Sequence, residues 1–281
     1  MATSSLLYRT LGAVLLVVAV VGCVLLHPLL YAALFAAGMA LMINEFYRMS
    51  LGSGTHTAVR AMMIALCVAF FLACVIFKLY NVDGKWLLVA FPLLAILLSA
   101  MLFDRQERIV RLTVQDICFP VVYLLLPFVV TNMLMFDSTG AYSPRLFVAV
   151  MTLVWMNDVG GYALGMAFGQ REKSRKLAPE ISPKKSWAGV AGSLLFTFLT
   201  AVVIYLTGIF AMPLWQWLVA ALIVVVLGIF GDLFESMIKR HYMQKDSGRI
   251  VIGHGGMLDR FDGALFAIPA VTVFFILAGV I

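Results

Sequence analysis

The sequence predicts an all-α polytopic membrane protein with about nine transmembrane helices. Of its 281 residues, 63% are hydrophobic and only 12% are charged, whereas ordinary soluble domains are roughly 45–50% apolar. Several charge-free runs also approach the ~20 residues that a helix needs to cross a bilayer core. These runs lack the strict alternation of a membrane strand, which favours helices over a barrel.

The expected spans follow the apolar runs in chain order. Their approximate ranges are 10–26, 28–44, 61–77, 86–103, 117–136, 146–169, 187–210, 213–231 and 263–281. The first pair is the open question, because the run from Thr10 to Asn44 has 35 residues and no charge. At 1.5 Å per residue this exceeds a single ~30 Å crossing. We place a hairpin at His27-Pro28, since proline disfavours the helical conformation in the residue before it. One long, kinked helix would reduce the count to eight.

Residues 1–281 are expected to form a single integral membrane domain. Residues 1–140 hold the N-terminal transmembrane helices, and residues 146–281 hold the helices and cytoplasmic loops that carry the candidate chemistry. The sequence has no internal repeat, no low-complexity tract and no long linker. Its four cysteines form no CxxC pair, so neither a disulfide framework nor a zinc site is indicated.

The basic residues predict which loops face the cytoplasm. Seventeen of the 20 Lys and Arg residues fall on one side of the alternating topology, and positively charged loops remain cytoplasmic. The loop 170–186 and the segment 232–262 both lie on this side. We therefore expect a multi-pass protein of the inner (plasma) membrane with a polar, cytoplasm-facing active-site cavity. Orientation explains the net charge of +6, and no nucleic-acid binding is expected without a soluble basic domain.

The end of the eighth span gathers charged residues on one helical face. If the helix continues past Gly231, positions i, i+3, i+4, i+7 and i+8 share that face. These positions hold Asp232, Glu235, Ser236, Lys239 and Arg240. The aspartate offers a hard oxygen ligand to a metal, and the cations neutralise phosphate oxygens further along. Glu235 has two interpretations, as a metal ligand or as the i, i+4 partner of Lys239.

A second polar run, KDSGRIVIGHGGMLDRFD, follows this helix. Its glycines permit positive-φ turns that bring backbone N–H groups close to an anion. Asp259 and Asp262 are spaced i, i+3, so both can point into one site. Asp232 would join them from the preceding helix. Carboxylates from two helices on one ion are a common way to hold Mg²⁺ with phosphates as its other ligands.

Two further polar elements precede this region. Asp158, beside Asn157 in the sixth span, would cost about 2.5–3.5 kcal/mol if it faced lipid, so we expect it to face inward. The loop 170–186 contains Pro179 and Pro183, which favour an extended loop over a helix. Its basic residues are candidates for contacts with lipid headgroups or a nucleotide.

Glycines recur every four residues after Asp158, at Gly161, Gly165 and Gly169. Small residues at this spacing allow two helices to approach closely. The stripe is expected to pack beside the site, and packing against a second subunit, in a homodimer, is the alternative.

These motifs resemble the phosphatidate cytidylyltransferase family, the CDP-diacylglycerol synthases. The family's hallmark appears here as Ser236-Met237-Ile238-Lys239-Arg240, Lys245-Asp246, His254-Gly255-Gly256 and Asp259-Arg260-Phe261-Asp262. Upstream, Asp158-Val159-Gly160-Gly161-Tyr162 is similar to its D-x-G-A-Y motif, and Ser182-Pro183-Lys184-Lys185-Ser186 to its S-P-K-K-T loop. Two residues depart from the pattern: Gly161 replaces the usual alanine, and Ala188 replaces a glutamate.

The resemblance implies a nucleotidyltransferase that uses CTP and phosphatidic acid, with the lipid bilayer as its setting. The products would be CDP-diacylglycerol and pyrophosphate, Mg²⁺ would be required, and a second cation such as K⁺ is compatible. Catalytic roles are implied for Asp232, Lys239, Asp246, Asp259 and Asp262, of which Asp232, Asp259 and Asp262 would bind the metal. Substrate contacts are implied for Asp158, Lys184, Lys185, Ser236, Arg240, Lys245, His254, Gly255, Gly256 and Arg260.

Other functions stay open at this point. Transfer to another lipid phosphate, such as a polyprenyl or ether lipid, would use the same motifs, and the sequence does not show the acyl-chain pocket. An ion-coupled transporter would also bury carboxylates beside broken helices. Against it, the halves of the chain share no repeated pattern, and the polar residues lie near the cytoplasmic ends of the spans. A purely structural membrane protein would leave the charge cluster without a purpose.

Overall fold

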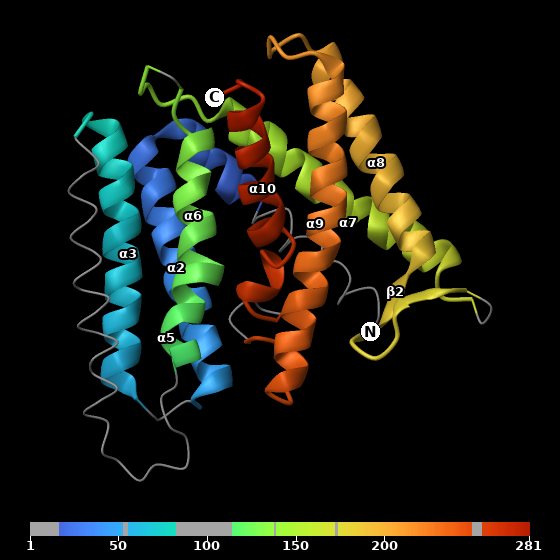
Figure 1. The fold of residues 1–281 in the computed structure, drawn as a ribbon, viewed down its shortest axis with the longest axis horizontal. Helices are drawn as coiled ribbons and strands as arrows, with labels where there is room; N and C mark the ends of the chain where they lie inside the picture. Colours follow the sequence, from blue (N-terminus) through green and yellow to red (C-terminus); the bar gives the residue numbers. More distant parts are fainter. Residues whose placement is uncertain (1–16, 53–55, 83–113, 138, 172–173, 249–254) are drawn as a thin grey trace. The chain divides into compact units, whose positions relative to one another are not determined.

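The computed structural model describes residues 17–52, 56–82, 114–137, 139–171, 174–248 and 255–281, and the statements below concern these residues (Figure 1). The expected span 86–103 lies outside them. The chain divides into two compact units. Their ranges are Met1–Asn132, Phe136–Ser143 and Asp246–Asp259 for the first unit, and Met133–Met135, Pro144–Lys245 and Arg260–Ile281 for the second. The single domain expected from the sequence stays a prediction.

Among the described residues, helices dominate both units. Five are long and apolar enough to cross a membrane: α2 (Pro28–Ser50), α3 (Thr57–Leu79), α7 (Arg145–Phe168), α8 (Trp187–Leu206) and α9 (Leu214–His241). Shorter apolar helices cover Val17–Leu26, Pro120–Leu134 and α10 (Ala264–Leu277). The predicted all-α membrane architecture is confirmed at this level, and the count of nine or eight spans stays a prediction.

In the first unit, α2 begins where the helical conformation is interrupted at His27. His27 has an extended backbone (φ −161°, ψ 138°), its ring accepts a hydrogen bond from the Leu29 N–H, and Pro28 occupies the first turn. The Leu29 N to His27 Nδ1 distance is 3.2 Å. Proline suits this position because its missing N–H would have no helical partner there. The predicted interruption of the helix at His27-Pro28 is confirmed, and the hairpin placed there stays a prediction.

Helices α2 and α3 pack with a third helical stretch that changes its winding. It runs through α5 (Val114–Phe119), a π-helical turn η3 (Pro120–Leu125), α6 (Leu126–Thr131) and a 3₁₀ turn η4 (Asn132–Leu134). The π turn begins at Pro120, which cannot donate a backbone hydrogen bond. A buried hydrogen bond of 2.7 Å, from Tyr31 Oη to Asn132 Oδ1, joins this stretch to α2.

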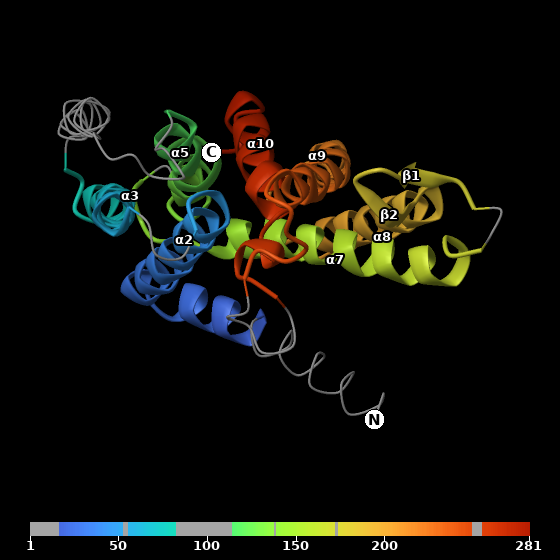
Figure 2. The same ribbon diagram turned by 90° about the horizontal axis from the view of Figure 1, so that it is seen from below.

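The second unit contains α7, α8, α9 and α10, and α8 lies alongside α7 (Figure 2). In the predicted stripe, a Cβ added at Gly161 would lie 2.8 Å from Ser193 Oγ, and one added at Gly165 would lie 3.6 Å from Gly189 Cα. At the neighbouring Gly160, an added Cβ would collide with the carbonyl oxygen of Gly192. Ser193 Oγ also donates to the Asn157 carbonyl at 2.8 Å. The expected close packing of the glycine stripe is therefore confirmed, with α8 of the same chain as the partner.

The loop 170–186 forms a small antiparallel hairpin. Strand β1 (Lys176–Ala178) pairs with β2 (Ser182–Ser186), with Lys176 opposite Ser186 and Ala178 opposite Ser182. Ser186 then caps α8, since its Oγ accepts from the Gly189 N–H at 3.3 Å. The predicted extended conformation is confirmed.

The close approach of α7 and α8 predicts a sharp cost for one added methyl group. Gly160→Ala should lower stability by about 1–3 kcal/mol, because backbone must move to admit the Cβ. Thermal unfolding in detergent measures the loss. Gly22→Ala is the matched control, since nothing lies within 4 Å of its added Cβ and alanine favours a helix. Equal melting temperatures for the two variants would contradict the packing described here.

Candidate active site

Helix α9 extends to His241, ten residues beyond Gly231, so the predicted polar face exists as one helical surface. Because Gly231 has no side chain, the backbone of Asp262 and Gly263 can lie close to α9. A Cβ there would lie 2.5 Å from the Asp262 carbonyl oxygen and 3.1 Å from Gly263 Cα. The chain just before α10 is thus held directly against α9 at Gly231, and Asp262 comes to lie beside the acidic residues of α9.

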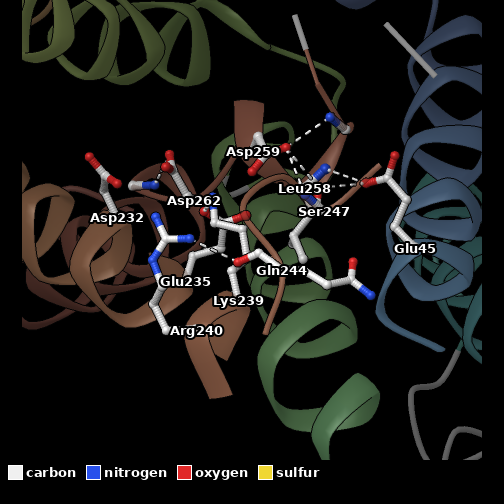
Figure 3. A network of polar contacts seen from close by, with 12 residues as sticks. Glu45, Asp232, Glu235, Lys239, Arg240, Gln244, Ser247, Leu258, Asp259 and Asp262 are labelled. Atoms are coloured by element: carbon white, nitrogen blue, oxygen red, sulfur yellow. Dashed lines mark hydrogen bonds and ion pairs between the residues drawn. The ribbon is translucent and has the colours of Figure 1, made fainter. Parts of the chain in front are cut away.

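Three carboxylates form a cluster at this junction (Figure 3). One oxygen from each of Asp232, Glu235 and Asp262 lies within 4.8 Å of the others. We call these three residues the carboxylate cluster. Around a Mg²⁺ ion at 2.0–2.1 Å, neighbouring oxygens are separated by ~3 Å and opposite ones by ~4 Å, and carboxylate oxygens are ligands that Mg²⁺ prefers. The cluster therefore offers three hard oxygen ligands to one divalent cation, with closure of the side chains around it.

Two lysines balance part of this negative charge. Lys185, from β2, contacts Asp232 with 2.5 Å between Nζ and Oδ2. Lys239 contacts Glu235 at 2.6 Å, with Glu235 fully buried and the lysine side chain 11% exposed. Both interpretations of Glu235 thus have support, because it pairs with Lys239 and also belongs to the carboxylate cluster.

The electrostatic field of the cluster favours a bound cation. Burial raises the pKa of Asp262 well above its ordinary value, and the charges of Asp232, Glu235 and Asp158 add to this effect. The Gly263 N–H opposes it by donating to Asp262 Oδ1 at 2.6 Å. Like charges at this range raise each other's free energy, so a cation among them is stabilised.

Asp158 belongs to the same neighbourhood. It lies within electrostatic reach of Asp232, Lys185 and Arg260, and its Oδ1 accepts from Asn157 Nδ2 at 3.3 Å. Its side chain is exposed in the structure. A carboxylate in the middle of α7 is thus brought toward the cluster by α7 packing within the second unit.

The remaining predicted residues of this unit differ in setting. Ser236 is buried on α9, whereas Lys184, Arg240, Lys245 and Arg260 are exposed. Arg240 Nη1 donates to the Gln244 carbonyl at 2.9 Å, which closes the end of α9. Exposed cations at this end remain accessible to a phosphate from solution or from a membrane surface.

In the first unit, Asp259 organises a turn. Its Oδ2 accepts from Gly256 N at 2.8 Å and from both Ser247 N and Ser247 Oγ at 3.0 Å. Gly255 has φ +86°, as expected for this glycine-rich stretch. Asp246 is exposed next to Ser247, and His254 lies outside the described residues. The Gly256 N–H therefore donates within the protein, and the shared metal of Asp232 and Asp259 stays a prediction.

A sequence model of the Cytidylyltransferase family matches residues 7–278. The chain belongs to this family. It is 43% identical to a phosphatidate cytidylyltransferase of Bacillus subtilis over 126 residues, and this alignment covers 45% of each chain. A Thermotoga maritima protein of the same name is 42% identical over 138 residues, 47% of this chain and 50% of the relative. A phosphatidate cytidylyltransferase of Staphylococcus epidermidis is 37% identical over 141 residues, which are 50% of this chain and 53% of the relative. The chain thus spans about half the length of the curated relatives it matches.

Two acidic residues outside the predicted metal set have defined partners in the structure. Glu235, for which the sequence left metal binding and pairing with Lys239 both open, joins Asp232 and Asp262 in the carboxylate cluster. Glu45 belongs to none of the predicted motifs. It lies in α2 and accepts hydrogen bonds from Met257 N and Leu258 N at 2.8 and 2.9 Å. Its signal was available, because it is the first acidic residue of the chain and ends a long charge-free run.

The buried pair on α9 predicts an asymmetric response to mutation. Lys239→Met should destabilise the protein by about 3–5 kcal/mol, because the Glu235 charge stays buried without its cation. Chemical unfolding in detergent measures this loss. The double variant Glu235→Gln/Lys239→Met should recover most of it.

Arg240→Met is the control for the lysine variant, since this exposed neighbour on the same helix should change stability by only about 0.5 kcal/mol. A loss in Lys239→Met no larger than in Arg240→Met would show that the buried pair contributes little.

Proposed function

We propose that the chain is a phosphatidate cytidylyltransferase, which transfers CMP from CTP to phosphatidic acid and releases pyrophosphate. Membership of the cytidylyltransferase family and the names of the relatives support this assignment. The observation that carries it is the carboxylate cluster, with three acidic groups within 4.8 Å. Lys185 and Lys239 beside it supply the positive charge that a polyphosphate substrate requires.

In the proposed reaction, a phosphate oxygen of phosphatidate attacks the α-phosphorus of CTP. The bond from that phosphorus to the oxygen bridging to the β-phosphate breaks, and pyrophosphate leaves with the bonding electrons. The lipid phosphate is the nucleophile, so no serine or cysteine nucleophile is needed. The protein's contribution is alignment of the two substrates and neutralisation of their charge.

The carboxylate cluster would hold Mg²⁺ through Asp232, Glu235 and Asp262. Held there, the ion would supply charge neutralisation to the phosphates and to the leaving pyrophosphate. Lys185 and Lys239 would contact phosphate oxygens near the cluster, and Arg240, Lys245 and Arg260 would contact those further out. The predicted metal role of Asp259, a second cation such as K⁺, and a homodimer remain parts of the proposal.

If the carboxylate cluster binds the metal, the same substitutions should lower both transfer activity and metal affinity. Asp232→Asn and Asp262→Asn should each lower transfer of label from CTP into chloroform-soluble lipid by on the order of 100-fold. Both should also weaken Mn²⁺ binding, followed by electron paramagnetic resonance without substrate, because each removes one anionic ligand. Asp137→Asn is the control, since this exposed aspartate keeps the oxygen that accepts from Thr139.

The proposal fails if folded wild-type protein transfers no label from CTP to phosphatidate at any Mg²⁺ concentration. Transfer to a polyprenyl phosphate instead would keep the chemistry and change the lipid substrate. Full activity in Asp232→Asn would remove the carboxylate cluster from the reaction.

The positive-inside orientation predicts opposite labelling of two loops. In a chain whose four native cysteines are replaced by alanine, Glu180→Cys in the hairpin should react with an impermeant maleimide only after the inner membrane is opened. Thr139→Cys, in the loop before α7, should react in intact spheroplasts. The reverse pattern would contradict a cytoplasmic active site in the inner membrane.

A further inference from the structure

Glu45 is a buried carboxylate of α2 that the proposed chemistry does not use. Its side chain is 1% exposed. Oε1 accepts from Met257 N at 2.8 Å, and Oε2 accepts from Leu258 N at 2.9 Å and from Ser247 Oγ at 3.2 Å (Figure 3). These donors lie 202 to 213 positions later in the sequence. Hydrogen bonds to a charged acceptor contribute about 1.5–3 kcal/mol each, so Glu45 is a strong anchor for this part of the chain.

The hydrogen bonds of the turn at residues 256–258 restrict its backbone conformation. Gly256 N–H donates to Asp259, and the next two amides donate to Glu45. Three consecutive N–H groups are therefore satisfied by carboxylates of the protein itself. An added Cβ at Gly256 would lie 2.6 Å from Glu45 Oε2, which leaves no room for a side chain. These amides are used for internal anchoring and are not left to cradle a phosphate.

We infer that Glu45 is a positioning residue for the transfer reaction. It holds Ser247 and the pair Met257-Leu258, and so fixes their chain neighbours Asp246 and Asp259 before any substrate binds. The inference rests on the proposed function, in which these two aspartates are candidate catalytic groups. Preorganisation of this kind lowers the cost of arranging charged groups during the reaction.

The carboxylate form is essential to this role. An amide at position 45 would present N–H₂ toward at least one of the two backbone donors, because Oε1 and Oε2 each accept from one. Glu45→Gln therefore keeps the shape of the side chain and breaks the anchor. Glu45→Asp keeps the charge and shortens the reach by one methylene group.

The test compares Glu45→Gln with Tyr31→Phe in the full-length protein. Tyr31 is also fully buried on α2, and its phenylalanine variant loses one hydrogen bond, to Asn132 Oδ1. Glu45→Gln should lower kcat by roughly 10- to 100-fold with a smaller change in KM for CTP. Amide exchange in peptides covering residues 244–248 and 255–260 should accelerate about tenfold, because the opened turn is no longer held by the carboxylate. Tyr31→Phe should lower the melting temperature and leave kcat and this exchange unchanged.

Unchanged exchange in Glu45→Gln would overturn the inference, whatever the activity. An equal loss of kcat in both variants would also overturn it, since Glu45 would then act only through general stability. Partial recovery of slow exchange in Glu45→Asp would support the need for a charged acceptor. If the wild-type protein transfers no CMP, the proposed function fails, and the exchange comparison still decides whether Glu45 anchors this turn.

Discussion

The candidate active site depends on the close approach of α9 and the start of α10. Gly231 has no side chain, and the Asp262 backbone occupies the space that a Cβ would need. Gly228 makes a similar approach to Gly263, with its carbonyl oxygen 3.1 Å from a Cβ added there. A larger residue at Gly231 or Gly263 would separate the helices. Asp262 would then move away from Asp232 and Glu235, and the carboxylate cluster would be lost.

This packing places like charges together in a protein that has few charges. Three carboxylates within 4.8 Å repel one another, and the burial of Glu235 adds a desolvation cost. Lys185 and Lys239 offset part of that cost by direct contact. A site held in this way is stabilised by binding a cation and then a polyphosphate, which matches the chemistry proposed for it.

In the first unit, acidic residues stabilise the conformation of a turn. Glu45 and Asp259 accept hydrogen bonds from a glycine-containing turn whose backbone would otherwise be free to move. These two groups of carboxylates therefore have different roles. Those of the carboxylate cluster face one another and suit an ion, whereas Glu45 and Asp259 face backbone N–H groups and fix the conformation of the chain.

The sequence by itself determined the membrane class, the break at His27-Pro28, the close-packed glycine stripe and the family. These follow from local signals: apolar length, the conformational limits of proline, small-residue spacing and side chains in a motif. Only the tertiary structure decided that Glu235 joins Asp232 and Asp262, and that Glu45 anchors a turn more than 200 positions away. It also gave Asp259 backbone partners that its motif did not predict. Such contacts depend on which helices pack together, and residue types along one segment do not specify the partner across space.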